Sequence, residues 1–114
     1  MVGWAGKRTN KYGARKTSVD GRTFHSAKEA KRYSELILLE RGGHIAELEC
    51  QPAFPIIVNN VSVCQVISDF AYVDLATGQR VYEDVKSNAT EANVVSRLKR
   101  KLLFAVHGVE PRIL

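Results

Sequence analysis

Two aspartates and a lysine have the residue types and the spacing that could hold a metal ion. In the stretch VYEDVKSN, Asp84 and Lys86 are two residues apart, so in a β-strand both emerge from one face while Glu83 emerges from the other. Asp69 lies in an earlier run, VSVCQVISDFAYVD, which we expect to be a strand joined to VYEDVKSN by the loop LATGQ. The candidate chemistry is therefore that of two carboxylates that share one cation.

The register of this hairpin decides which residue faces Asp69. One candidate register centres the loop between Ala76 and Thr77. It places Asp69 directly opposite Asp84, whereas a turn shifted by one residue makes Asp69 face Lys86. Both registers keep the three charged side chains on one face, because they preserve the alternation of side chains. The other face is expected to be core and carries Phe70, Tyr72, Val81 and Val85.

Two opposed carboxylates need a compensating cation. Their Cβ atoms would lie ~5 Å apart, and like charges in that position are destabilising. Lys86 supplies one positive charge, but a divalent ion bound by both carboxylates is the stronger solution. Oxygen ligands with several retained waters suit Mg²⁺, for which Mn²⁺ can substitute. The alternative is an Asp–Lys–Asp ladder on the surface, which has little energetic consequence.

A helix is predicted in TFHSAKEAKRYSELILLERGG, and its first turn carries another acid. Ser26 is a good N-cap, and Glu29 follows three residues later as in a capping box. Gly42 and Gly43 end the helix. Glu29 falls inside the apolar arc of the helical wheel, so it can complete the capping box, complete a metal shell, or hold a metal-bound water. The capping role is compatible with either metal role.

The remaining segments complete the predicted fold. IAELECQPAFPIIV is expected to be a strand interrupted at Gln51 and Pro52, TEANVVSRLKRKLLFAVHG an amphipathic helix, and VEPRIL a short terminal strand. The order helix, about three strands, helix, strand predicts an α/β (α+β) fold with one mixed sheet flanked by helices. The apolar stripe of the second helix is expected to face inward, with Val94, Val95, Leu98, Leu102, Ala105 and Val106.

Four motifs together resemble a known family. FHSAKEA, LECQPAF, VISDF and EDVKS, in this order, look like the PD-(D/E)XK nuclease superfamily, and most of all its small phage-encoded members, which are similar in size to Holliday-junction resolvases. The resemblance covers about residues 23–113 and implies a restriction-endonuclease-like αβββαβ core. One departure is Ser68, which stands where the superfamily often has a proline before the motif aspartate.

The resemblance implies an activity and a role for each motif residue. The activity would be Mg²⁺-dependent hydrolysis of phosphodiester bonds in DNA, with Lys86 positioning the attacking water or stabilising the transition state. Gln51 either orients a metal-bound water or a phosphate, or is a bulge residue whose amide satisfies backbone groups. The implied catalytic residues are Glu29, Gln51, Asp69, Asp84 and Lys86, and the implied metal ligands are Asp69, Asp84, the carbonyl of Val85, and Glu29.

Positive charge is concentrated at the N-terminus. Residues 1–25 carry six basic residues and one acidic residue, so they account for the net charge of +5, and the rest of the chain is balanced. We expect residues 1–22 to be a flexible basic arm that binds DNA phosphates, or else a solubilising tail, ahead of a nuclease domain at 23–114. The second helix adds cations that either track a phosphate backbone or are simply solvated. The expected DNA-binding residues are Lys7, Arg8, Lys11, Arg15, Lys16, Arg97, Arg100 and Lys101.

The expected DNA substrate is defined by shape. No recognition helix, zinc finger or aromatic-rich single-strand platform is evident in the sequence, so sequence-specific base reading is not expected. Branched DNA, such as a Holliday junction in phage recombination or processing, is the expected partner, cut by a homodimer because one site cuts one strand. The alternatives are a nicking endonuclease of packaging or defence, and a non-catalytic nucleic-acid-binding protein that keeps the fold.

Membrane and secretory roles are not expected. No run of ~18 apolar residues is present, and the N-terminus has no apolar stretch of signal-peptide length. Cys50 and Cys64 are isolated and are expected to be reduced. These features predict a cytoplasmic protein, located in the host bacterial cytoplasm if the chain is phage-encoded.

Overall fold

The computed structural model describes residues 17–19, 21–85 and 93–114. The chain divides into two compact units, Met1–Leu38 and Leu39–Leu114. The described ranges contain two helices and a mixed sheet, so the predicted α/β (α+β) class is confirmed. None of the helices in the described ranges is long and apolar enough to span a membrane.

The first unit begins with a short β-hairpin. Strand β1 (Thr17–Val19) pairs antiparallel with β2 (Arg22–Phe24), and helix α2 (Ala27–Arg41) follows. The rings of Phe24 and Tyr33 lie 5.0 Å apart between centroids and are both buried. Part of the range 1–22, which we expected to be a flexible arm, therefore has regular structure, because the backbone of Thr17–Val19 pairs with β2.

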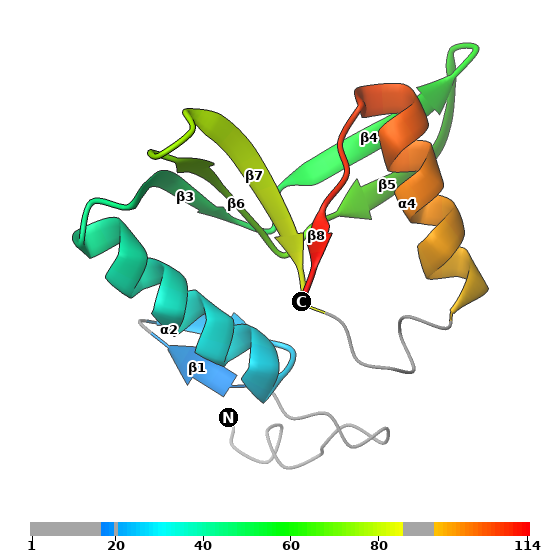
Figure 1. The fold of residues 1–114 in the computed structure, drawn as a ribbon. Helices are drawn as coiled ribbons and strands as arrows, with labels where there is room; N and C mark the ends of the chain where they lie inside the picture. The colour runs from blue at the N-terminus through cyan, green and yellow to red at the C-terminus, as the bar shows by residue number, and fades with distance from the viewer. Residues whose placement is uncertain (1–16, 20, 86–92) are drawn as a thin grey trace, which may run out of the picture. The chain divides into compact units, whose positions relative to one another are not determined.

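The second unit contains a four-stranded mixed sheet in the order β3-β6-β7-β8 (Figure 1). Strands β3 (Ile45–Cys50), β6 (Phe70–Asp74) and β7 (Gln79–Asp84) are antiparallel neighbours. Strand β8 (Arg112–Ile113) adds to the sheet parallel to β7, and Figure 1 shows it on the α4 side of β7. The sheet therefore ends in a strand that comes from the last residues of the chain.

A second hairpin carries helix α4 (Val94–His107) on one face. Strands β4 (Ala53–Val58) and β5 (Val61–Ile67) are joined by Asn59 and Asn60, which both have the positive φ that a type I′ turn requires. The core between helix and hairpin is small and consists of Ile56, Val66 and Leu103, with Phe54, Cys64, Leu102 and Val109 packed against it.

The inward face predicted for α4 is wrong for most of its residues, although Leu102 does pack against the core. Val94, Val95 and Leu98 are exposed, by 67% in the case of Val94, whereas Leu103 is completely buried. A two-stranded hairpin is narrow, so it covers only a thin strip of the helix and leaves much of the apolar stripe at the surface. Periodicity identified an amphipathic helix, but it could not identify the width of the surface that receives it.

Strands β3 and β4 are two halves of one bent strand, and β5 and β6 are two halves of its partner. Cys50 pairs with Phe70 on one side of the bend, and Ala53 pairs with Ile67 on the other. Between them, the Gln51 N–H donates to the carbonyl of Asp69 (2.8 Å), and the Ser68 N–H donates to the carbonyl of Pro52 (3.1 Å). The ladder thus continues in one register through the bend, at the position where the sequence predicts an interruption.

Candidate active site

Asp69 and Asp84 lie opposite each other where β6 begins and β7 ends. Phe70 pairs with Glu83 in the ladder, and the Asp69 N–H donates to the carbonyl of Glu83 (3.1 Å). The hairpin therefore has the register whose loop is centred between Ala76 and Thr77. Of the two registers that the sequence allowed, this is the one that brings the two aspartates together.

Each of the two carboxylates accepts a hydrogen bond from the backbone of the opposite strand. Asp84 Oδ1 accepts from the Asp69 N–H (3.1 Å), and Asp69 Oδ2 accepts from the Val85 N–H (2.7 Å). Hydrogen bonds to an ionised acceptor are stronger than neutral ones, so they orient the carboxylates firmly. Asp84 is only 4% exposed and Asp69 is half-buried, which does not fit a solvated surface ladder.

The main chain around the acidic pair is held from both sides. On one side, the Gln51 N–H bonds the Asp69 carbonyl; on the other, the Leu114 N–H bonds the Asp84 carbonyl (2.9 Å). Gln51 has φ 56°, a left-handed conformation that non-glycine residues seldom adopt, and its side chain is exposed. The predicted role of the Gln51 side chain stays a prediction, whereas its backbone contributes directly to the bend beside Asp69.

Ser68, which stands where the superfamily often has a proline, takes part in the strand pairing before Asp69. Its N–H donates to the carbonyl of Pro52, and a proline would remove that donor from the ladder. Its side chain is completely buried, and Ser68 Oγ has no hydrogen-bond partner among the described residues. A hydroxyl of this kind is costly to bury, because the water that it loses is not replaced.

Glu83 lies on the opposite face from the acidic pair, as the alternation predicts. It is fully buried on the same face as Phe70, and Tyr72 Oη donates to Glu83 Oε2 (2.5 Å). The sequence prediction missed this burial. The signal was available, because Tyr72 and Glu83 are diagonal neighbours on adjacent strands in the observed register, within reach of a long side chain.

Glu29 forms the predicted cap of helix α2 in a modified form. The Glu29 N–H donates to Ser26 Oγ (3.1 Å), while Glu29 Oε1 accepts from the N–H of His25 (3.2 Å), one residue before the N-cap. The carboxylate therefore satisfies a backbone donor at the helix start. Glu29 belongs to the first unit, and its role as a metal ligand stays a prediction.

Several predicted site residues lie outside the described ranges. They are Lys86 of the D-x-K motif and the arm residues Lys7, Arg8, Lys11, Arg15 and Lys16. Within residues 17–19, 21–85 and 93–114, no group of three or more His, Cys, Asp or Glu side chains is placed to hold a metal ion. The acidic centre in this part of the chain is therefore a pair of carboxylates.

The acidic pair has a donor set that fits Mg²⁺. This ion is usually bound through one or two protein carboxylates and keeps several waters or takes phosphate oxygens from a substrate. Asp69 and Asp84 supply two carboxylates held in place by backbone N–H groups, and the role of the Val85 carbonyl as a further ligand stays a prediction. A soft metal would favour sulfur or imidazole ligands instead.

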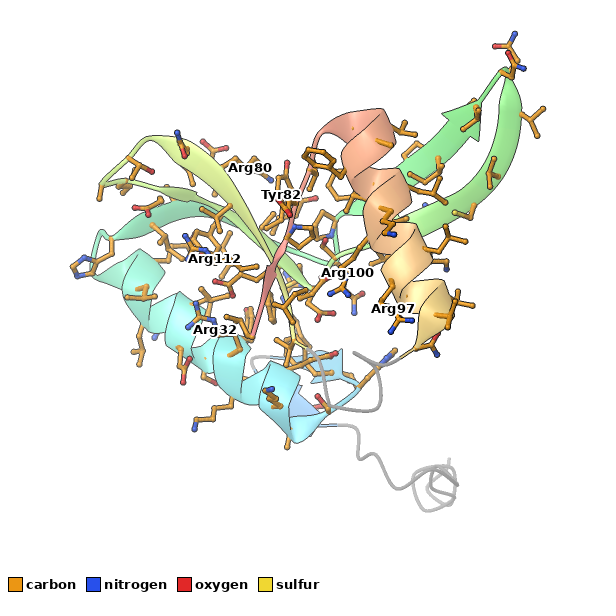
Figure 2. All side chains as sticks on the ribbon, turned by 45° about the vertical axis from the view of Figure 1, so that its right-hand side comes forward. Arg32, Arg80, Tyr82, Arg97, Arg100 and Arg112 are labelled. Atoms are coloured by element: carbon orange, nitrogen blue, oxygen red, sulfur yellow. The ribbon has the colours of Figure 1, made fainter. Side chains whose placement is uncertain are left out.

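The predicted cations of α4 line a groove of about 400 Å³. Figure 2 shows Arg97 and Arg100 projecting from the helix. The opposite wall is formed by Glu110 and Pro111, which lead into β8, and by Ile113 of β8 itself, which pairs with Asp84 in the sheet. The groove is lined by Arg97, Arg100, Lys101, Phe104, Glu110, Pro111 and Ile113. The sequence prediction found the three cations but missed Phe104 among them.

A mixed sheet that ends in two opposed aspartates next to a basic groove defines an α/β protein with a candidate polyanion-binding site. The chain belongs to the family described as "Protein of unknown function (DUF1064)", whose model matches residues 9–110. Comparison with curated proteins gave no match, and neither did comparison with solved structures.

Proposed function

We propose that this protein is a metal-dependent DNA endonuclease that hydrolyses phosphodiester bonds in branched DNA. The observation that carries the proposal is the Asp69–Asp84 pair, in which two partly or fully buried carboxylates face each other across a hairpin. Like charges in this position are destabilising without a cation. Backbone N–H groups also fix the orientation of both carboxylates, which supports a role in binding a cation.

Asp69, Asp84 and the Val85 carbonyl would hold Mg²⁺. When bound, the ion would polarise the scissile phosphate and lower the pKa of a coordinated water. The Val85 N–H holds the Asp69 carboxylate in one orientation, and the Asp69 N–H does the same for Asp84. Lys86 is proposed to orient the attacking water or to stabilise the transition state, and Glu29 to complete the site.

DNA is the proposed substrate because of the distribution of charge. Arg97, Arg100 and Lys101 line the groove beside the acidic pair, and residues 1–25 carry the whole net charge of +5. Lysine and arginine contacts to phosphates release condensed counterions, which supplies affinity that does not depend on sequence. Selectivity for branched DNA is proposed because such contacts read backbone shape.

A homodimer is proposed because one site cuts one strand, and paired cuts require two chains. The β4–β5 hairpin offers a neutral apolar surface for a second copy, since neither strand contains a charged residue. Its exposed apolar residues are Ile57, Val58, Val61, Val63 and Ile67. Light scattering should give the mass of a dimer for the wild type and of a monomer for Val63→Glu. A monomeric wild type at high concentration would disprove the dimer.

The nuclease proposal is tested by incubating the full chain with labelled four-way junction, flap, nicked duplex and single strands. Cleavage is expected with Mg²⁺ or Mn²⁺ and not with EDTA, and it should be lost in Asp84→Asn, which keeps the shape of the side chain and the Oδ1 acceptor. Asp74→Asn is the matched control, because Asp74 stands at the other end of β6 and caps the loop through the Ala76 N–H (2.9 Å).

Three results would contradict the proposal. Cleavage that survives EDTA or Asp84→Asn would reject the metal mechanism. Equal cutting of linear duplex and branched DNA would reject selectivity for structure. Salt-sensitive DNA binding without any cleavage would favour a non-catalytic nucleic-acid-binding protein.

A further inference from the structure

The groove beside α4 combines positive charge with an exposed aromatic ring. Arg97, Arg100, Lys101 and Phe104 lie on one face of the helix, because they occupy positions i, i+3, i+4 and i+7. The Phe104 side chain is 58% exposed, although a ring of this size usually contributes to a core. A ring that lies among cations and outside the core is available to a ligand.

The size of the groove limits that ligand. Its volume of about 400 Å³ lies near the lower end of the range of ~300–1,000 Å³ that is typical of sites for small molecules. Such a space holds one or two nucleotides of a strand and cannot enclose a duplex. The bases of a duplex are also stacked on one another, so they offer no face to Phe104.

We propose that this groove binds an unpaired stretch of a DNA strand, with Phe104 stacked on a base and the cations at its phosphates. Aromatic rings that stack on bases beside cations that follow the backbone are the usual means of binding single strands without reading sequence. Glu110, which also lines the groove, would repel phosphate and could accept a hydrogen bond from an amino group of an unpaired base.

The groove lies close to the acidic pair, because one residue of its wall is on the strand next to Asp84. Ile113 forms part of its wall and is the neighbour of Asp84 in the β7–β8 ladder, and adjacent strands are ~4.8 Å apart. This step rests on the proposed nuclease function. A strand that leaves the groove past Ile113 would reach Asp84 within a short stretch of backbone. The preferred substrate class is therefore a branch with an unpaired strand, such as a flap, rather than a fully paired four-way junction.

Fluorescence anisotropy in EDTA tests the binding without cleavage. The probes are a labelled oligothymidylate, the same oligomer with abasic positions, and a fully paired duplex. Phe104→Ala should weaken oligothymidylate binding about tenfold, a typical effect of losing one stacked base, and leave the other two probes within about twofold. Phe104→Tyr should restore binding. Lys101→Gln should weaken the binding of both single-stranded probes. It should also reduce the steepness of log K against log[salt] by about 0.7.

Leu98→Ala is the matched control, because Leu98 is an exposed apolar residue of the same helix that does not line the groove. Circular dichroism checks that each variant is folded. The proposal is wrong if folded Phe104→Ala binds oligothymidylate like the wild type, or loses affinity for all three probes equally. The first result together with Mg²⁺-dependent cleavage would reject the groove and leave the nuclease. If binding depends on Phe104 but no DNA is cleaved, the groove proposal is supported and the nuclease proposal is rejected.

Discussion

Replacing Asp84 by asparagine is expected to stabilise the protein when no divalent metal is present. Opposed residues on antiparallel strands have Cβ atoms about 5 Å apart. Two unit charges at about that distance repel by about 3 kcal/mol at an effective dielectric constant of about 20. Asparagine keeps an oxygen for the Asp69 N–H, but a neutral acceptor gives up about 1 kcal/mol. The net gain in the free energy of unfolding is therefore about 2 kcal/mol.

Thermal unfolding in EDTA measures this gain. For a chain of 114 residues, about 2 kcal/mol corresponds to a rise in Tm of about 8 °C. Added Mg²⁺ should reverse the order of the two Tm values, so that the wild type becomes more stable than Asp84→Asn. At a Mg²⁺ concentration of about 100 times Kd, the wild type gains about 2.7 kcal/mol, and Asp84→Asn should lose most of that gain because it lacks one of the two carboxylates.

Asp74→Asn is the control for the loss of one negative charge and should behave like the wild type with and without Mg²⁺. The reasoning would be refuted if the Tm of the wild type did not rise with Mg²⁺ or Mn²⁺ while Asp84→Asn had a lower Tm in EDTA. That combination would mean that Asp69 and Asp84 are stabilised within the fold and have no need of a cation.

Two further predictions concern the second unit. Leu103→Ala should lower the free energy of unfolding by about 2–5 kcal/mol in urea titrations, because Leu103 is fully buried in the core that holds α4 to the β4–β5 hairpin; a cost below about 1 kcal/mol would mean that this core contributes little. Ser68→Ala should leave the free energy of unfolding unchanged or raise it by about 1 kcal/mol, since Ser68 Oγ is buried without a hydrogen-bond partner in the described part of the chain. A marked loss of stability in the same titration would show that the hydroxyl has a bound water or ion.

The acidic pair could be predicted from the sequence because strand geometry is rigid. Side chains alternate with a period of two, so both registers considered for these two runs place Asp69 and Asp84 on one face. The loop then left two registers, and the observed Phe70–Glu83 pair selects one of them. The cap of α2 was equally local, since it depends on Ser26 and its next few residues.

Features that depend on distant segments could not be predicted in this way. The exposed stripe of α4 follows from the narrow hairpin beneath it, which the helix sequence does not encode. The position of Ile113 beside Asp84 depends on a parallel pairing of only two residues at the end of the chain. Phe104 was not among the residues expected on the inward face, and its place in the groove depends on the segment that packs beside the helix.

The bend through Gln51–Pro52 and Ser68–Asp69 also determines how the second unit can open. Each bent strand belongs to both sheets, and the ladder between them continues through the bend without a break in register. Fraying of the β4–β5 hairpin would therefore propagate to the backbone of Asp69, and the two sheets should behave as one cooperative unit in hydrogen exchange. The acidic pair thus lies beside the bend that joins the two sheets, and its backbone amides are expected to exchange together with both.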